Sequence, residues 1–516
     1  GAGLPGYEGD PDTRPTPAEQ ENQIGIGHDG MWLFTESNDE GVLCINHEFG
    51  INPHVLGKDF PEGLTDVRLS QAAHGCAVVV VARDGDGKWD VVLDEPRNRR
   101  ITVNTPVEFD GPVAGTEFLE NEAENAPLGT VNNCGSGFTP WGTYLTCEEN
   151  FNGYFGSNDP DFDPLDEKQD RYGFSANGFG YGWHVYDPRF DLSNPDYRNE
   201  YNRFGWVVEI DPQNPDKPPV KHTALGCFKH EAIAIRVPQT GKVHCYMGDD
   251  QRFDYCYKFV SKKPWQVSLD QGESPLAEGT LYVARFNADG TGDWLELSIE
   301  NPVLAESERF SSQAELLVNT RIAADLLGAT PMDRPEWTTI AADGDSVFWT
   351  LTNNSRREET DAANPEAPNN DGHIIRTRDR GQGTGKKFDW EIFLLASSTR
   401  GSEGVFTDPD AAYADPDGRL FIGTDGGQPD GLQEQPTLFD ASEGAPVPKR
   451  LFVGANSDEI TGWAQTPDRK TGMTNMQHPG NGNPAATNFP AEPDSGKIPR
   501  DCTIVITKKD GGIIGS

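Results

Sequence analysis

The sequence predicts an all-β protein, a six-bladed β-propeller with long loop insertions and a few short helices. Two observations support this prediction. Only 35% of the 516 residues are hydrophobic, whereas 57 Gly and 39 Pro make the composition rich in turns. In addition, one hairpin-like pattern recurs six times, which is typical of a repeat architecture. A chain of this length can form one domain when its fold is a propeller or a barrel.

Each copy of the pattern contains a polar motif, a short apolar strand, a turn ending in Gly, an alternating strand and a second polar motif. We predict one domain over residues 1–516, with copies near 28–48, 133–150, 229–250, 334–354, 407–426 and 459–480. The start and the end of a hairpin are neighbours, so all the polar motifs should gather at one mouth of the central channel.

The copies share little identity, and a β-sandwich with several tight turns is therefore the alternative fold. The propeller is favoured by CINHE (44–48) and CFKHE (227–231), which both read C-x-x-H-E although they lie 183 residues apart. Between the copies, Asn150–Tyr201 and Glu358–Asp371 are predicted to be long surface loops. The clearest helical pattern runs over Leu304–Leu327 and ends before Gly328.

Charge excludes several classes of function. The formal net charge is −40, and such a chain repels nucleic-acid phosphates and anionic membranes. No run of 18 apolar residues is present, so no segment is predicted to span a bilayer. Eight cysteines are too few in 516 residues to form a disulfide scaffold.

The polar ends of the six copies are rich in carboxylates. The candidates are Glu48; Cys134 with Glu148 and Glu149; Glu231 with Asp249 and Asp250; Glu336; Asp425; and Glu459 with His478. Converging carboxylates repel one another unless cations lie between them. Carboxylate oxygens select Ca²⁺ or Mg²⁺, and one thiolate among them points to a transition ion, most plausibly iron. For any one acid, a solvated strand end is the alternative. His47, His230 and His478 are not predicted as ligands, because a histidine beside a ligand more often supports it or packs.

Two residues have competing interpretations. Arg334 lies two residues before Glu336 in DRPEW, where it could hold a phosphate oxygen or form a salt bridge to Asp333 or Glu336. Cys134 lies between Asn133 and Gly135, where it could bind a metal, fill a core position or form half of a disulfide. Motifs of serine hydrolases, P-loop proteins, zincins and zinc ribbons are absent from the sequence.

The chain resembles a known family in a set of ordered motifs. They are NHEF (46–49), NNCGSGFTPWGTYLTCEEN (132–150), KHEA (229–232), YMGDD (246–250), DRPEW (333–337), TNN (352–354), GHIIR (372–376) and GRLFIGTDGG (418–427). Together, over about residues 26–480, they look like the PhoX family of bacterial alkaline phosphatases. The NNC…TCEEN block is the most specific part.

The resemblance implies a six-bladed propeller with a mixed Fe³⁺ and Ca²⁺ cluster at the channel mouth. It also implies that metal is bound by Glu48, Cys134, Glu149, Glu231, Glu336 and Asp425, and that Arg334 contacts phosphate. Glu149 is chosen over Glu148, and Asp425 over Asp410, from the family pattern and not from spacing. The resemblance further implies export by the twin-arginine route, to the periplasm or the medium.

The predicted function is the hydrolysis of small phosphate monoesters by a monomeric enzyme, with metal ions activating the attacking oxygen. Two alternatives stay open at this point. One is a calcium-dependent propeller lactonase or phosphodiesterase, which needs no thiolate ligand. The other is a calcium-stabilised binding propeller without catalytic activity.

Overall fold

The computed structural model describes residues 9–164, 166–381, 385–442 and 446–516. Most of its regular structure is β, with short helices between the strands, which confirms the prediction of a mainly β fold. The chain divides into two compact units. Unit 1 comprises Gly1–Glu108, Leu119–Lys221 and Ala455–Ser516, and unit 2 comprises Phe109–Phe118 and His222–Gly454.

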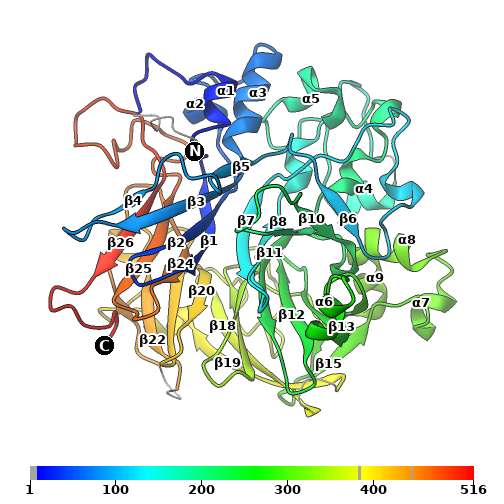
Figure 1. Ribbon diagram of the computed structural model, residues 1–516. Helices are drawn as coiled ribbons and strands as arrows, with labels where there is room; N and C mark the ends of the chain where they lie inside the picture. The colour runs from blue at the N-terminus through cyan, green and yellow to red at the C-terminus, as the bar shows by residue number, and fades with distance from the viewer. Residues whose placement is uncertain (1–8, 165, 382–384, 443–445) are drawn as a thin grey trace. The chain divides into compact units, whose positions relative to one another are not determined.

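Unit 1 contains three antiparallel sheets (Figure 1). Their strand orders are β1-β2-β3-β4, with β5 paired to β3; β6-β10-β9-β8-β7; and β24-β25-β26. Strand β1 contacts both β7 and β24, so the edge strands β7, β1 and β24 of the three sheets lie side by side. The strands are β1 (His28–Thr35), β2 (Glu40–His47), β3 (Gly75–Arg83), β4 (Trp89–Val91), β5 (Arg99–Ile101), β6 (Glu108–Asp110), β7 (Asn133–Phe138), β8 (Tyr144–Glu148), β9 (Val207–Ile210), β10 (Val220–His222), β24 (Glu459–Gln465), β25 (Thr471–Gln477) and β26 (Cys502–Thr507).

Unit 2 contains a nine-stranded sheet and a four-stranded sheet. Their orders are β11-β12-β13-β14-β15-β19-β18-β17-β16 and β20-β21-β22-β23. Strand β16 contacts both β11 and β20, which repeats the side-by-side arrangement of unit 1. The strands are β11 (His230–Arg236), β12 (Lys242–Asp249), β13 (Cys256–Pro264), β14 (Gly279–Phe286), β15 (Thr291–Glu296), β16 (Pro335–Ile340), β17 (Ser346–Leu351), β18 (His373–Asp379), β19 (Lys387–Leu395), β20 (Pro409–Ala414), β21 (Arg419–Thr424), β22 (Thr437–Asp440) and β23 (Lys449–Arg450).

An antiparallel hairpin stands near each of the six sequence copies. The hairpins are β1-β2, β7-β8, β11-β12, β16-β17, β20-β21 and β24-β25. Four of the predicted turn glycines, Gly142, Gly241, Gly344 and Gly418, have positive φ, a conformation that only glycine adopts without steric cost. Strands β2, β8 and β17 are buried along nearly their whole length, because each has neighbours on both faces.

Apolar side chains between the sheets form the cores. In unit 1, Val42 and Val78 pack with Tyr144 and Ile210, which joins the β2-β3 face to the β8-β9 face. In unit 2, Trp337, Phe348 and Leu420 belong to one buried cluster that joins the sheet of β16 to that of β20. Each such side chain contributes about 1.5–3 kcal/mol through burial.

The helices are short and lie between strands. They are α1 (Pro17–Gln20), α2 (Asn52–Val55), α3 (Leu64–Ala73), α4 (Glu167–Arg171), α5 (Trp183–Tyr186), α6 (Trp265–Asp270), α7 (Pro302–Glu306), α8 (Gln313–Val318) and α9 (Thr320–Leu327), with 3₁₀ turns η1 (Glu117–Leu119), η2 (Phe151–Tyr154), η3 (Pro188–Phe190), η4 (Pro195–Tyr197), η5 (Glu200–Arg203), η6 (Thr223–Leu225), η8 (Ala396–Thr399) and η9 (Pro429–Gly431). None of the helices within the described residues has the length and hydrophobicity of a transmembrane segment.

The predicted helix over Leu304–Leu327 is wrong in length and right at its end. The segment forms three helices, α7, α8 and α9, and Gly328 closes the last one with φ of 67°. Asn319 separates α8 from α9 with non-helical dihedrals of −112° and 36°. Buried apolar residues occur on both sides of this break, Leu317 and Val318 in α8 and Ile322 in α9, so periodicity alone does not reveal the interruption.

The segment Asn150–Tyr201 is not the surface loop that the sequence predicts. Its short helices enclose a cluster of buried aromatic rings, with Tyr154 stacked on Tyr181 at 4.4 Å between ring centroids. Trp183 lies 4.6 Å from Tyr154 and is fully buried. Polar turn residues dominate the composition of this segment, and the aromatic residues among them carry its packing.

One buried polar network joins four strands of the nine-stranded sheet. Asp379 at the end of β18 accepts hydrogen bonds from Lys258 Nζ on β13 at 2.5 Å and from Tyr246 on β12 at 2.7 Å. Its other oxygen accepts from Trp294 Nε1 on β15 at 2.7 Å. Both the Asp379 and the Lys258 side chains are 1% exposed. Burial alone would raise the pKa of Asp379, but the donors His244, Lys258 and Tyr246 outweigh it and hold the pKa at about 2.

Replacement of Asp379 by Asn should cost about 3–5 kcal/mol of stability at neutral pH, because it leaves the buried Lys258 cation without its partner. A depressed folded-state pKa stabilises the protein above the unfolded value of about 3.9, and this stabilisation is lost as pH falls toward 2. The stability gap between wild type and Asp379→Asn in urea unfolding should therefore narrow between pH 4 and pH 2. The control is Asp389→Asn, which removes an ion pair to Arg380 whose side chains are 55% and 47% exposed. A gap that stays constant with pH would contradict the prediction.

Candidate metal and phosphate site

The first strand of each of the six hairpins carries one extra residue relative to its partner strand. In β16, for example, Pro335 pairs with Leu351 and Thr338 pairs with Trp349. The chain therefore advances three residues along β16 while it advances two residues along β17. Such a β-bulge changes the direction of a side chain at the end of a sheet. In five hairpins the bulge begins after the first residue of the strand.

The second residue of these five strands, at the bulge, is a potential metal ligand in every case. These residues are Asp29, Cys134, Glu231, Glu336 and Asp410. All are at most 8% exposed. In the sixth hairpin the bulge lies later, between Thr461 and Ala464, and the second residue is Ile460.

A second set of polar side chains follows the partner strands. The residue directly after β2, β8, β12, β21 and β25 is Glu48, Glu149, Asp250, Asp425 and His478, respectively. The same position after β17 is held by Thr352. The first and last residues of a hairpin pair with each other, so each residue of this set except His478 lies near the bulge of its own hairpin.

In unit 1 these residues form a first cluster, made up of Asp29, Glu48, Cys134 and Glu149. Ligand atoms of Glu48, Cys134 and Glu149 lie within 4.8 Å of one another. Cys134 Sγ lies 2.9 Å from Asp29 Oδ2. A Cβ on Gly30 would lie 2.8 Å from the Cys134 carbonyl oxygen, so only glycine permits this approach of β1 to β7.

Residues outside the first cluster hold Glu48, Cys134 and Glu149 in place by hydrogen bonds. Gln477 Nε2 donates to Glu48 Oε2 at 2.7 Å, and Tyr154 donates to the Glu48 carbonyl at 3.1 Å. Asn132, with φ of +48°, accepts the Glu149 backbone N–H on its carbonyl oxygen at 3.0 Å. Asn46 Nδ2 donates to the Cys134 carbonyl at 2.6 Å. The backbone and side chains of the first cluster are thus fixed by hydrogen bonds from outside it.

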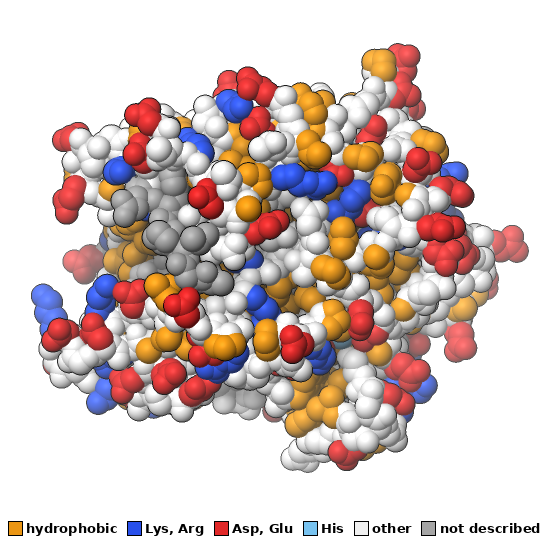
Figure 2. All heavy atoms as spheres, turned by 45° about the horizontal axis from the view of Figure 1, so that its top comes forward, with side chains coloured by type: hydrophobic (Ala, Val, Ile, Leu, Met, Phe, Trp, Pro, Cys, Tyr) orange, Lys and Arg blue, Asp and Glu red, His pale blue; other side chains and the backbone are white. Residues whose placement is uncertain are grey.

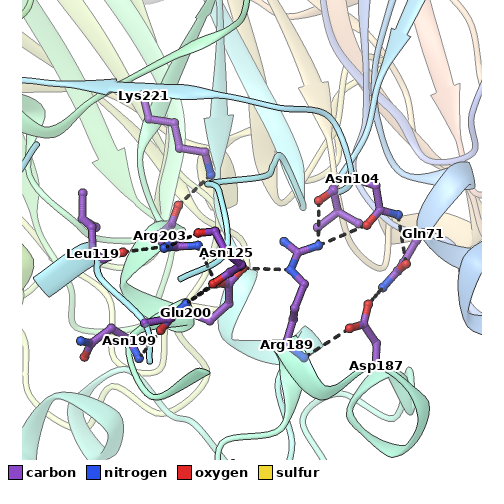
Figure 3. Close-up of polar contacts among 12 residues, drawn as sticks. Gln71, Asn104, Leu119, Asn125, Asp187, Arg189, Asn199, Glu200, Arg203 and Lys221 are labelled. Carbon is purple, nitrogen blue, oxygen red and sulfur yellow. Dashed lines mark hydrogen bonds and ion pairs between the residues drawn. The ribbon is translucent and has the colours of Figure 1, made fainter. Parts of the chain in front are cut away.

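Glu148 differs from Glu149 because it belongs to a buried ion network. Lys221 Nζ lies 2.6 Å from Glu148 Oε1 with both side chains 0% exposed, and it also donates to the Arg203 carbonyl. Figure 3 shows the network continuing from Arg203 through Glu200 to Arg189. Glu148 therefore neutralises a buried lysine, while Glu149 joins the group of potential ligands.

In unit 2 a second cluster contains Glu231, Asp250, Arg334, Glu336, Asp410 and Asp425. Ligand atoms of Glu231, Glu336 and Asp410 lie within 4.8 Å of one another. Burial raises the pKa of Glu336 well above its usual value, and the charges of Asp250, Asp410 and Asp425 add to this while Arg334 opposes it. The described residues of this cluster thus carry more negative than positive charge.

Arg334 lies among carboxylates of the second cluster. Its Nε and Nη2 form a bidentate pair with Asp250 at 2.9 and 3.0 Å, and Nη2 is 2.6 Å from Glu336 Oε1. The predicted partner Asp333 instead pairs with Arg357 at 2.5 Å. Arg334 has φ of 57°, a costly conformation for a non-glycine residue, and is 18% exposed. Its Nη1 makes no hydrogen bond to any described residue.

The structure brings the predicted residues together in part. Glu48, Cys134 and Glu149 gather in unit 1, and Glu231 and Glu336 gather in unit 2. Asp425 lies 3.8 Å from Arg334 with 35% of its side chain exposed, and one of its ligand atoms lies within 4.8 Å of one of Asp410, which in turn is close to Glu231 and Glu336. Asp29 and Asp410 were not chosen from the sequence. Alignment of the copies on the first strand residue would have placed both in register with Cys134, Glu231 and Glu336.

The three histidines that were not predicted as ligands have other partners. His47 Nε2 accepts the Gly25 backbone N–H at 3.2 Å, and His230 Nε2 is 2.8 Å from the Gly226 carbonyl. His478 Nε2 lies 3.1 Å from Glu459. All eight cysteines are free thiols in the structure, so Cys134 is not part of a disulfide.

The outer surface is acidic. Figure 2 shows Asp and Glu side chains spread over the face in view, with Lys and Arg side chains between them. This agrees with the net charge of −40.

Comparison with known proteins identifies the family. The model of alkaline phosphatase PhoX matches residues 2–480. A structure of Pseudomonas fluorescens PhoX in complex with vanadate, a transition state analogue, is 38% identical, with a TM-score of 0.90 over 99% of this chain and 94% of that chain.

Solved structures of lower similarity carry no argument about the function of this chain. A protein of unknown function from Dyadobacter fermentans has 10% identity and a TM-score of 0.41, covering 94% of this chain and 97% of that chain. A gluconolactonase from Xanthomonas campestris has 10% identity and a TM-score of 0.31, covering 89% and 85%. No protein with a curated description matches the chain. On the family match and the 38% identity, the chain belongs to the PhoX family of alkaline phosphatases and is a phosphomonoester hydrolase.

Proposed function

We propose that the chain releases phosphate from small organic esters, and that the first cluster in unit 1 and the second cluster with Arg334 in unit 2 bind the metal ions and the phosphoryl group. The observation that carries this proposal is the repeated geometry: five hairpins present a carboxylate or thiol at the same bulge position. A purely structural role would not require an acid or a cysteine at each of these buried positions.

The donor set fits the metal ions that the family implies. Glu48, Cys134 and Glu149 are proposed as ligands in unit 1, and Glu231, Glu336 and Asp425 in unit 2, with Asp29 and Asp410 added from the geometry. The carboxylates suit Ca²⁺, and the thiol of Cys134 suits Fe³⁺. When bound, the ions polarise the phosphoryl oxygens and lower the pKa of water.

The residues of the chain have separate roles in this proposal. Arg334 would contact the phosphoryl group through Nη1, because Nε and Nη2 are already held by Asp250 and Glu336. This fixed guanidinium stabilises charge on the equatorial oxygens without reorganisation. The complex of P. fluorescens PhoX with vanadate supports a phosphoryl-transfer site in this fold.

We further propose that the six hairpins belong to the six blades of one propeller over residues 1–516. The support is the hairpin at each sequence copy and the TM-score of 0.90 to P. fluorescens PhoX. Export through the twin-arginine route to the periplasm or the medium is proposed from the family resemblance alone. The monomeric state stays a prediction.

The clearest test uses Cys134. A thiolate on ferric iron absorbs visible light by charge transfer, so the metal-loaded protein should be coloured, and Cys134→Ala should lose both colour and iron. Elemental analysis, an absorption spectrum and an assay on p-nitrophenyl phosphate measure this.

The matched control is Cys245→Ala, a buried thiol on β12 outside both clusters. It should keep colour, iron and turnover. A colourless, iron-free wild type with full activity would contradict the role of Cys134. Calcium without iron in active protein would point to a carboxylate-only site.

A further inference from the structure

Arg252 is a second arginine beside the second cluster. It lies in the loop after β12, two residues beyond Asp250. Its Nη2 donates to Asn353 Oδ1 at 2.9 Å, and no carboxylate of the described residues forms an ion pair with it. Arg334, by contrast, pairs with Asp250 and Glu336. Arg252 therefore brings a positive charge that its own surroundings do not neutralise by direct contact.

The position of Arg252 is fixed by the backbone. Arg252 forms a β-bridge with Asp333, the residue before Arg334. Asn353, which orients the guanidinium, donates in turn to Asp408 at 2.8 Å. Burial lowers the pKa of Arg252, and the nearby cations Arg334 and Arg356 lower it further, while the charges of Asp250 and Glu336 oppose this from a distance. These cations repel Arg252, so an anion between or beside them would be attracted strongly.

The next residue indicates that the loop is held in a defined shape. Phe253 has φ of 72° and is 39% exposed, an unfavourable state for a bulky aromatic residue. Its backbone N–H donates to the Met332 carbonyl at 2.8 Å, and the Arg357 guanidinium lies 5.2 Å from its ring. The loop thus carries Arg252 on a fixed support, as a residue that recognises a ligand requires.

The location relative to Arg334 suggests which part of a substrate Arg252 meets. In the proposed function, Arg334 contacts the phosphoryl group that is transferred. Arg252 is half-buried, and Arg356, whose charge acts on it, is exposed, so both side chains are accessible to solvent. A protein of net charge −40 repels multiply charged anions, and local cations at the site would offset this repulsion.

We propose that Arg252 binds a second anionic group of the substrate, a carboxylate or phosphate on the leaving group of a phosphomonoester. The preferred substrates are then esters that carry at least one further negative charge. This inference rests on the proposed function, because it assigns the transferred phosphoryl group to Arg334 and the two clusters.

The test compares two esters that differ by one charge, phenyl phosphate and 3-carboxyphenyl phosphate, on the metal-loaded enzyme. In Arg252→Gln, kcat/KM for the carboxylated ester should fall roughly 10-fold, while that for phenyl phosphate should change less than about twofold. Arg252→Lys should recover part of the difference, since it retains the charge and loses the planar fork. The matched control is Arg198→Gln, an exposed arginine of unit 1, which should leave both values unchanged.

The outcomes separate this inference from the proposed function. Equal losses for both esters would overturn it, because Arg252 would then act on the shared phosphoryl group or on the fold. No loss for either ester would overturn it as well. Wild-type enzyme that hydrolyses neither ester with its metals bound would instead refute the proposed function. A selective loss with normal metal content and an unchanged melting temperature would support the assignment.

Discussion

Glu231→Gln should reduce phosphatase activity below detection and lower the melting temperature. Glu231 is 1% exposed, and ligand atoms of Glu231, Glu336 and Asp410 lie within 4.8 Å of one another. The substitution therefore removes one negative charge from a proposed cation site. The amide oxygen of glutamine is a weaker ligand than a carboxylate. A cation held by several strands stabilises the folded state by mass action, by about 4 kcal/mol at 1,000 times its dissociation constant.

The measurements are the turnover of p-nitrophenyl phosphate, the bound metal per chain, and thermal unfolding with and without a chelator. Glu278→Gln is the control, because Glu278 lies on the surface of the same unit, where its side chain is 60% exposed. The chelator should lower the melting temperature of wild type and of this control, and it should have a smaller effect on Glu231→Gln. Full activity and full metal content in Glu231→Gln would show that Glu231 is not a ligand.

Arg334→Ala should lower kcat/KM by roughly 10²-fold or more while the fold and the metal content persist. The side chain is 18% exposed, and its Nη1 remains available after Asp250 and Glu336 have taken the other nitrogens. Loss of a donor fixed toward the transition state reduces the rate of the chemical step. The inhibition constant for vanadate should therefore rise by a similar factor, since vanadate imitates that state.

Two variants separate phosphate contact from the salt bridge. Arg334→Lys keeps a positive charge near Asp250 but loses the planar fork, so it should recover only part of the lost activity. Arg378→Ala removes an exposed arginine that pairs with Asp343 on the same unit and should have almost no effect. Unchanged kinetics in Arg334→Ala would mean that the arginine serves only its ion pairs.

The mainly β fold could be predicted from the sequence because its signal is local. Turn glycines and alternating apolar residues define each hairpin separately, and Gly142 and Gly344 adopt the positive φ that such turns require. The ordered motifs also identified the family, since the NNC…TCEEN block contains residues whose chemistry is unusual for a strand end.

Three features could not be predicted by the same reasoning. The break at Asn319 depends on tertiary packing that overrides a continuous apolar pattern. The aromatic cluster around Tyr154 and Trp183 depends on contacts across a segment rich in turn residues. The position of Asp410 at a bulge depends on strand register, which composition does not give, although alignment of the six copies would have placed Asp410 in register with Cys134, Glu231 and Glu336.

The different roles of the neighbouring acids Glu148 and Glu149 could not be predicted from the residues alone either. Glu148 and Glu149 are identical in type, and only the fold shows that Glu148 forms an ion pair with Lys221. The preference for Glu149 came from the family resemblance, and its role as a metal ligand stays a prediction. The structure adds a physical reason, since a buried lysine without Glu148 would be an uncompensated charge.

The bulge has a consequence for how such centres change over time. The extra residue of a bulge is left out of the regular ladder of hydrogen bonds, so its side chain can be exchanged at little cost to the sheet. Asp29, Cys134, Glu231, Glu336 and Asp410 hold this one position in five hairpins, and if they bind metal as proposed, a single substitution at any of them would change the preference for hard or soft ions. The bulge residue of each hairpin can thus be substituted independently of the others, so the metal preference of a proposed site could change one residue at a time while the sheets stay the same.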